Sequence, residues 1–495
     1  MNCVPCLTWI SRGVAEKEPH KLQLSPEEIK KLIAETKALN EKEGIDEDEE
    51  ISENSENDEA NIKQEIPSTD KTQNAEESDD IEAKYGLDTY DDDESDEKPF
   101  FNISDVVTHV DNKDDEYMTD SEWEDEVEEK EDFIIKDTDN LLAVGHIEDE
   151  SSVLEIYVYN KNEDAFYVHH DIVLPAYPIA LEWLNFHASD EKPGNYLAVG
   201  DMTPVIKIWD LDVVDILEPE YELGKQKKKK LKGKLGHTDA VLSLSWNKHV
   251  RNLLASGSAD NSIILWDLTE AKLMNKLKFH PNKVQALQWH PHESPFLLSG
   301  CTDGYLKLYD CRDSETVAKS WKIDGEVERV AWNLFDSFKF FCSNDKGFVH
   351  CMDMRCEKED YNFAAHENAV TGLDMSTLNP DILITASMDE SLKIWNVKDN
   401  YQLVDEYKFK VGSIYAARLA PDLNLTVAVG GNNASNSLKV MDISEKVNSN
   451  LGQMQDSLSE ASSAKINNPN IKRELDVNVA SGTKDFKMKK RKQSD

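Results

Sequence analysis

The chain has 495 residues and a formal net charge of −43, and 39% of its residues are hydrophobic. No apolar run is long enough to span a bilayer and no secretory leader is apparent, so we expect neither a membrane protein nor a secreted one. The seven cysteines are scattered and odd in number, which favours a reducing compartment over a disulfide framework.

The N-terminal residues predict a strand followed by a helix, together residues 1–40. Val4–Ile10 has a strand pattern that ends in a tryptophan and an isoleucine. Ser25–Glu28 is a capping box with proline at the first helical position, so we expect a helix to about Leu39. Cys3 and Cys6 are spaced like half of a zinc site, but their alternation with apolar residues favours the strand.

Residues 41–132 form an acidic segment with 39 Asp and Glu against seven Lys. Such a segment buries too little apolar surface to offset chain entropy, so we expect it to be disordered. Ser55, Thr119 and Ser121 each precede an acid by three residues, the pattern of acidophilic kinase sites. Phosphorylation of at least one would deepen the negative charge, although acidic tracts also contain such patterns by chance.

Two ladders of residues, 43 positions apart, follow the acidic segment. The first is Trp246, Trp289 and Trp332; the second is Trp266-Asp267, Tyr309-Asp310, Met352-Asp353 and Trp395-Asn396. Further steps at Tyr159-Asn160, Trp209-Asp210 and Met441-Asp442 bring the second ladder to seven. Repeats of about 40 to 45 residues are typical of the WD-repeat β-propeller, with one four-stranded blade per repeat. We therefore predict an all-β, seven-bladed propeller over residues 133–444.

Each repeat contains short strands joined by tight turns, as in Val241–Trp246, Leu253–Gly257 and Ser262–Trp266. Val4–Ile10 looks like a displaced copy of the tryptophan-bearing strand. We therefore expect it to join the propeller sheet and to help close the ring, which removes an exposed edge. The alternative is an independent segment that binds a partner.

A histidine and an aspartate recur within the repeats. His237, His280 and His366 precede the turn residues Asp260, Asp303 and Asp389 by 23 positions, and the strand-end residues Trp266, Tyr309 and Trp395 by 29. Buried polar groups need partners, so we expect a hydrogen-bonded network that reaches Ser258 or Ser387 and the indole N–H. His–Asp catalysis is disfavoured because catalytic pairs are not repeated once per blade. The repeat that ends at Asp353 has Asp324-Gly325 near the histidine position.

Two basic clusters interrupt the acidity. Residues 225–234 carry seven lysines in a loop inserted between blades, and six basic residues between Lys484 and Lys492 lie in a polar tail, 445–495, that we expect to be flexible. Candidates for nuclear localisation or weak rRNA contact are Lys227, Lys228, Lys229, Lys230, Lys489, Lys490, Arg491 and Lys492. Both clusters lack interleaved aromatic residues, which disfavours sequence-specific RNA recognition, and a solvated loop is the alternative.

Several stretches resemble the periodic tryptophan protein 1 family: Trp9…Gly13-Val14-Ala15, Tyr167–Ile172, Glu182–Phe186, Met202–Ile206 and Gly236–Val241. The resemblance covers residues 1–40 and 133–443. It implies a nuclear, mainly nucleolar WD-repeat scaffold for ribosome biogenesis: assembly of large-subunit precursors, pre-rRNA processing and, in animals, control of ribosomal DNA transcription through chromatin.

These observations favour a non-enzymatic, monomeric propeller without a cofactor, a catalytic site or a metal site. The expected partners are proteins of pre-ribosomal particles, and basic proteins (ribosomal proteins or histones) that the acidic segment attracts. The alternative is a chromatin-associated, histone-binding regulator, which would require an aromatic cage for methyl-lysine. An enzyme is disfavoured because no nucleophile–base or metal constellation stands out.

Overall fold

The structure is a computed structural model that describes residues 2–21, 133–149, 151–187, 193–224, 236–313, 316–398 and 400–451. The predicted helix to Leu39, the acidic segment, both lysine clusters and the three phosphorylation candidates lie outside the described residues. No helix among the described residues is long and apolar enough to cross a membrane.

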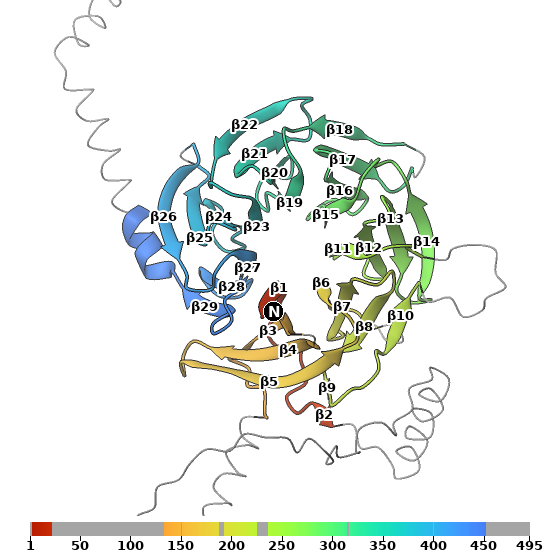
Figure 1. Cartoon of the computed structure of the whole chain (residues 1–495), viewed down its shortest axis with the longest axis vertical. Coiled ribbons are helices and arrows are strands. Elements are labelled where there is room, and N and C mark those ends of the chain that lie inside the picture. Colours follow the sequence, from red (N-terminus) through yellow and green to blue (C-terminus); the bar gives the residue numbers. More distant parts are fainter. Residues whose placement is uncertain are drawn as a thin grey trace, which may run out of the picture. The chain divides into compact units, whose positions relative to one another are not determined.

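Seven antiparallel sheets surround a central opening, one for each step of the second ladder (Figure 1). The first blade contains β1 (Cys3–Ile10), β3 (Asn140–Glu148), β4 (Ser151–Asn160) and β5 (Ala165–Leu174), and the second β6 (Pro178–Leu184), β7 (Tyr196–Asp201), β8 (Ile206–Asp210) and β10 (Tyr221–Leu223). The third contains β11 (Val241–Trp246), β12 (Leu253–Ser258), β13 (Ile263–Asp267) and β14 (Lys272–Leu277), and the fourth β15 (Val284–Trp289), β16 (Phe296–Cys301), β17 (Tyr305–Asp310) and β18 (Lys319–Lys322).

The fifth blade contains β19 (Val327–Trp332), β20 (Lys339–Asn344), β21 (Phe348–Asp353) and β22 (Glu359–Ala364), and the sixth β23 (Val370–Met375), β24 (Ile382–Ser387), β25 (Ser391–Asn396) and β26 (Gln402–Lys408). The seventh has three strands among the described residues: β27 (Ile414–Leu419), β28 (Thr426–Gly431) and β29 (Leu438–Asp442). A short parallel pair, β2 (His20–Lys21) with β9 (Val213–Val214), lies outside the blades. The predicted seven-bladed, all-β propeller is confirmed.

The burial of each strand follows its place in the blade. All six residues of β24 are buried, because a middle strand is covered by the neighbouring blade on each face. The outer strand β22 is almost entirely exposed. The residues of the second ladder all lie at or near the end of the third strand in their blade. Trp209, Trp266, Tyr309 and Met352 are buried there between successive blades.

The N-terminal strand β1 is the innermost strand of the first blade and pairs with β3 across the whole acidic segment. The indole N–H of Trp9 donates to the backbone oxygen of Arg418 in the seventh blade, at 3.2 Å. Val4 packs against Gly430 so closely that a Cβ at residue 430 would lie 2.4 Å from a Val4 methyl carbon. β1 therefore joins the first blade to the last, as the sequence pattern predicts.

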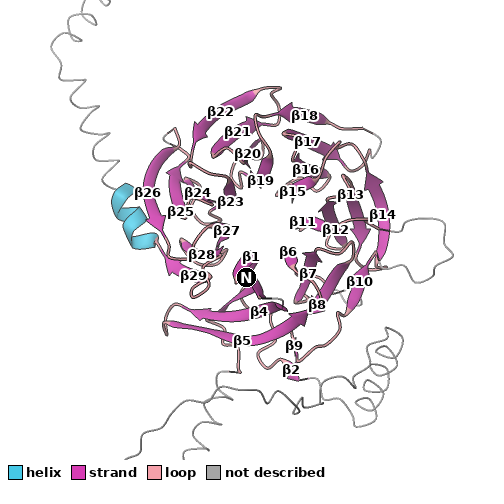
Figure 2. Ribbon diagram, viewed as in Figure 1, coloured by secondary structure: helices cyan, strands magenta, loops and turns pink. Residues whose placement is uncertain are grey.

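The chain leaves the seventh blade through a short helix, residues 444–451, which lies beside β26 and β29 (Figure 2). Ile443 and Val447 are 2% and 0% exposed and belong to the apolar core that also contains Val404 of β26. Asn450 donates to the Val404 carbonyl at 3.2 Å. The prediction of a flexible tail from residue 445 is therefore wrong for its first seven residues, because this helix covers apolar surface between two blades.

Candidate functional site

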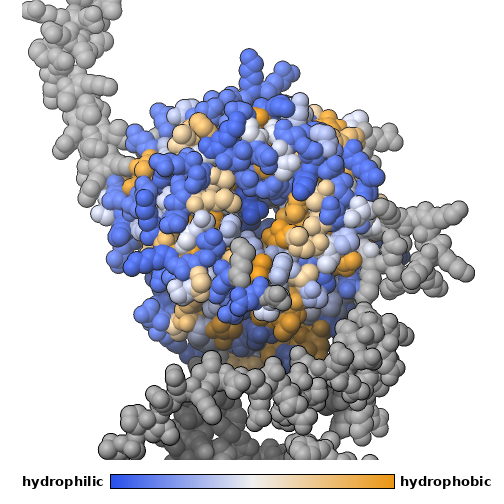
Figure 3. Space-filling model, in the orientation of Figure 1, coloured by the Kyte–Doolittle hydropathy of each residue, from blue (hydrophilic) through white to orange (hydrophobic). Residues whose placement is uncertain are grey.

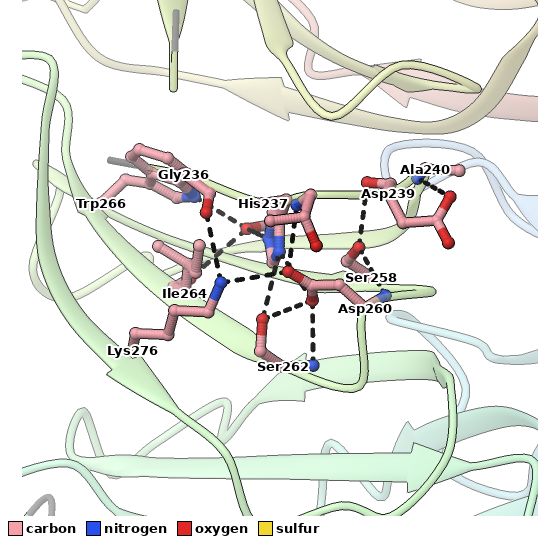
Figure 4. Close-up of polar contacts among 12 residues, drawn as sticks. Gly236, His237, Asp239, Ala240, Ser258, Asp260, Ser262, Ile264, Trp266 and Lys276 are labelled. Carbon is pink, nitrogen blue, oxygen red and sulfur yellow. Dashed lines mark hydrogen bonds and ion pairs between the residues drawn. The ribbon is translucent and has the colours of Figure 1, made fainter. Parts of the chain in front are cut away.

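The third blade contains the repeated hydrogen-bond network in its complete form (Figure 4). His237 Nδ1 lies 3.2 Å from an Asp260 carboxylate oxygen, and His237 Nε2 lies 2.7 Å from the Ser256 hydroxyl. The Trp266 indole N–H donates to the same hydroxyl at 2.7 Å. Lys276 also pairs with Asp260 at 3.0 Å. One network thus connects the loop before the blade with its second, third and fourth strands.

The sixth blade repeats this arrangement. His366 lies 2.9 Å from Asp389 and 2.8 Å from the Thr385 hydroxyl, which accepts the Trp395 indole N–H at 2.8 Å. The hydroxyl at the centre is therefore that of Ser256 or Thr385, and the expectation of Ser258 or Ser387 is wrong. These two serines lie at the strand ends, where their hydroxyls accept the backbone N–H groups of Asp260 and Asp389 in the turns.

The fourth blade does not complete the network. His280 Nε2 lies 2.7 Å from the Ser299 hydroxyl, but the expected hydrogen bond between His280 and Asp303 is not formed. His280 Nδ1, Asp303 Oδ2 and the Tyr309 hydroxyl are buried without a hydrogen-bond partner among the described residues. In the complete blades a serine, Ser262 or Ser391, also bonds the aspartate, and this position is Tyr305 here.

Electrostatics indicate that the complete networks are structural. Burial lowers the pKa of His237 and of His366, and both histidine side chains are 0% exposed. Burial alone would raise the pKa of Asp260, but hydrogen bonds from His237 and Ser262 hold it well below its ordinary value. The carboxylate therefore remains charged beside a neutral histidine, and the histidine is enclosed in the blade. This arrangement fits a connection between strands better than catalysis.

The second blade carries a different buried polar pair that sequence reasoning missed. The Lys207 ammonium contacts the Asp201 carboxylate, and the two side chains are 8% and 1% exposed. Asp201 also accepts the backbone N–H of Thr203 at 2.8 Å. The signal in the sequence is weak, because an aspartate and a lysine six residues apart mark a hairpin contact only when the turn between them is known.

Two residues of the first ladder, Trp289 and Trp332, have a separate role at the inner surface of the ring, whereas the Trp246 indole N–H donates to Arg251 within its own blade. The Trp289 backbone N–H and indole N–H donate to the hydroxyl and the carbonyl of Ser245, at 3.1 and 3.0 Å. Trp332 makes the same pair of bonds to Gln288, at 2.7 and 3.3 Å. Each bond crosses from one blade to the next, so these tryptophans connect successive blades. The bond from Trp9 to Arg418 is the member of this series that closes the ring.

The innermost strands also line a funnel at one mouth of the opening, with a cavity volume of about 280 Å³. Burial raises the pKa of Glu182 and of Asp374 in its wall, while the charge of Arg418 opposes both shifts. The walls thus combine tryptophan edges with charges of both signs. Apolar residues lie next to the central opening within a mostly hydrophilic surface in the space-filling view (Figure 3).

Loops that join the first and second strands of the blades form the rim of this funnel. Three residues of these loops, here called the rim patch, are Phe335, Phe338 and Leu378. They belong to adjacent blades, are 51%, 40% and 56% exposed, and lie outside the set of residues that line the cavity. Arg355 stacks over Phe338, with its guanidinium carbon 4.3 Å from the ring centre. Large apolar side chains that neighbouring loops hold at the surface are typical of protein-binding sites. Nothing in the residue spacing predicted them.

Comparisons with known proteins agree with this architecture. The family model "WD domain, G-beta repeat" matches residues 228–267, 271–310 and 357–396. The chain is 36% identical to the periodic tryptophan protein 1 homolog of Drosophila melanogaster, over 87% of this chain and 92% of that protein. It is 30% identical to periodic tryptophan protein 1 of Saccharomyces cerevisiae, over 89% and 88%, and 39% identical to an uncharacterized WD repeat-containing protein of Schizosaccharomyces pombe, over 75% of each.

Proposed function

The chain belongs to the periodic tryptophan protein 1 family, and from this premise we propose that it is a non-enzymatic nuclear scaffold for ribosome biogenesis. In this role it supports the assembly of large-subunit precursors, pre-rRNA processing and ribosomal DNA transcription by binding proteins. The observation that carries the proposal is the similarity to relatives over nearly their whole length, 92% of the Drosophila protein and 88% of the yeast protein.

The described residues support a platform for several partners. Hydrogen bonds between blades fix the loops of the ring relative to one another, so contacts at separate loops keep a constant spacing. The buried histidines connect strands rather than face a substrate. The rim patch supplies exposed apolar side chains on adjacent blades. A rigid body with dispersed contact sites favours assembly over chemistry.

The acidic segment and the basic clusters add charge to this platform. The segment 41–132 has a net charge of −32 and suits basic partners such as ribosomal proteins or histones. The lysine clusters suit nuclear localisation, mainly to the nucleolus, and weak, salt-sensitive contact with rRNA. Phosphorylation at Ser55, Thr119 or Ser121 would strengthen the attraction of the acidic segment for basic partners.

Sedimentation of the tagged full-length chain from nuclear extracts tests this function. A scaffold of pre-ribosomes co-migrates with large-subunit precursors and returns to the light fractions after RNase treatment. Retention on nuclease-resistant chromatin would instead support the histone-binding alternative. Migration as a free protein in growing cells would contradict both.

The rim patch allows a sharper version of this experiment. The double substitution of Phe335 and Leu378 by glutamate places two charges on the patch and should weaken co-migration at least about tenfold if these side chains are anchors. Val173→Glu is the matched control, because Val173 is 68% exposed on the outer strand β5 of another blade. Equal loss in the control would show that added charge alone, and not the rim patch, is responsible.

A further inference from the structure

The fourth blade differs from the two complete blades at three positions of the network, one of which is Tyr309 in place of the tryptophan. Cys301 stands where the third and sixth blades have Ser258 and Ser387, and Tyr305 stands where they have Ser262 and Ser391. The histidine and the aspartate are retained. Cys301 and Tyr305 therefore replace two serine side chains by a thiol and a much larger phenol, while the acid and the base are unchanged.

The changed positions bring three different ligand groups together. A ring nitrogen of His280, the Cys301 sulfur and a carboxylate oxygen of Asp303 all lie within 4.8 Å of one another. His280 and Cys301 are 7% and 0% exposed, whereas Asp303 is half-buried at the turn. Two of the three residues are therefore enclosed, and the third lies at the edge of the blade.

In two of these groups one polar atom lacks a partner, although Asp303 Oδ1 accepts the backbone N–H of Tyr305 at 3.0 Å. His280 Nδ1 and Asp303 Oδ2 are buried without a hydrogen bond among the described residues, although the equivalent pairs in the third and sixth blades are 3.2 and 2.9 Å apart. Buried unpaired polar atoms are rare in folded proteins, because each costs about 1–3 kcal/mol. The local arrangement therefore favours a ligand that both atoms contact.

The bond on the other side of the imidazole makes Nδ1 suitable for a cation. Ser299 Oγ lies 2.7 Å from His280 Nε2 and 3.3 Å from the Lys307 carbonyl oxygen. When the hydroxyl donates to this carbonyl, it accepts the Nε2–H, and Nδ1 is left with a lone pair. A histidine that donates its second N–H to a fixed acceptor is the usual form of a metal ligand.

We propose that His280, Cys301 and Asp303 bind a zinc ion. Imidazole, thiolate and carboxylate are the protein ligands that zinc prefers. The thiol releases its proton on binding, and the two anionic ligands then neutralise the charge of the ion. Ligand atoms of a tetrahedral site lie about 3.3–3.8 Å apart, so the widest pair closes by about 1 Å. The fourth position remains for water or for a donor of a bound partner.

Zinc would replace the missing connection in this blade. It would tie the loop before β15, through His280, to the turn between β16 and β17, through Cys301 and Asp303. The His–Asp hydrogen bond makes the same connection in the third and sixth blades. The site is independent of ribosome biogenesis, so either proposal can fail without the other.

The test uses the purified full-length chain, stripped with a chelator and then titrated with zinc, or with cobalt as a spectroscopic probe. Cys301→Ser restores the serine of the complete blades and should preserve the fold. Cys311→Ser is the matched control, because Cys311 is a half-buried thiol directly after β17 that lies outside the three-ligand group. Wild type and Cys311→Ser should bind one more zinc than Cys301→Ser and show a cobalt–thiolate absorption band that Cys301→Ser lacks.

A second variant separates a loss of zinc binding from a loss of folding. His280→Gln keeps a hydrogen-bonding side chain and should weaken zinc binding at least about tenfold, while melting curves without metal remain cooperative. Zinc should raise the melting temperature of the wild type and of Cys311→Ser only. Equal zinc uptake by the wild type and Cys301→Ser, as binding to the acidic segment would give, or a missing thiolate band in the wild type, would overturn the proposal.

Discussion

Replacing Trp9 by phenylalanine tests how the ring is closed. Trp9 is 6% exposed, and its indole N–H donates to the carbonyl of Arg418 in the seventh blade. Phenylalanine removes this donor and part of the buried ring. The unpaired carbonyl costs about 1–3 kcal/mol, and the lost apolar contact adds about 1 kcal/mol. We therefore expect the free energy of unfolding to fall by about 2–4 kcal/mol.

Thermal unfolding followed by circular dichroism measures this loss. For a domain of this size, 1 kcal/mol corresponds to about 2 °C, so the melting temperature should fall by about 4–8 °C. Trp289→Phe is the matched control, because Trp289 is 5% exposed and bonds the carbonyl of Ser245 in the preceding blade. If β1 closes the ring as an ordinary inner strand, the two variants should lose similar stability. A normal melt for Trp9→Phe beside a lowered melt for Trp289→Phe would refute this reasoning.

Three further predictions concern buried polar groups. Ser256→Ala removes the hydroxyl that joins the histidine and the tryptophan of the third blade, and urea unfolding should show a loss of about 1–3 kcal/mol. Lys207→Met leaves the carboxylate of Asp201 buried without its partner, so the same assay should show a loss of about 3–5 kcal/mol, whereas an unchanged midpoint would contradict the buried pair. Burial lowers the pKa of His170 to about 3. The neutral His170 side chain therefore contributes its full share of the unfolding free energy above the unfolded pKa of about 6.5, and this share is lost as the pH falls towards 3. His170→Phe should therefore reduce the slope of unfolding free energy between pH 6 and 4 by about 1.4 kcal/mol per pH unit; an unchanged slope would exclude this assignment.

The sequence predicts the number and kind of blades because one residue at the end of each third strand must fill the same space between blades. It also predicts β1, since Trp9 repeats the pattern of Trp246 and Trp289. Ring closure by β1 is harder to predict, because its pairing with β3 joins residues that the long acidic segment separates.

The details of the polar networks are less accessible to sequence reasoning. Ser256 and Ser258 lie two residues apart on one strand, and only the depth to which His237 enters the blade decides between them. The bond missing at Asp303 accompanies Tyr305 in place of the serine of the complete blades, and the residue spacing alone does not report this loss. The exposure of the rim-patch side chains depends on how neighbouring blades are packed. A local sequence pattern does not contain this information.

Crosslinking combined with mass spectrometry on particles purified through the tagged chain tests the central claim most directly. A scaffold whose ring presents fixed contact sites should give reproducible crosslinks between Lys248, Lys339 or Lys398 near the ends of the blades and proteins of large-subunit precursors. The double glutamate variant of the rim patch should reduce the crosslinks on its side of the ring. Crosslinks confined to histones, or none from the ring at all, would contradict the account.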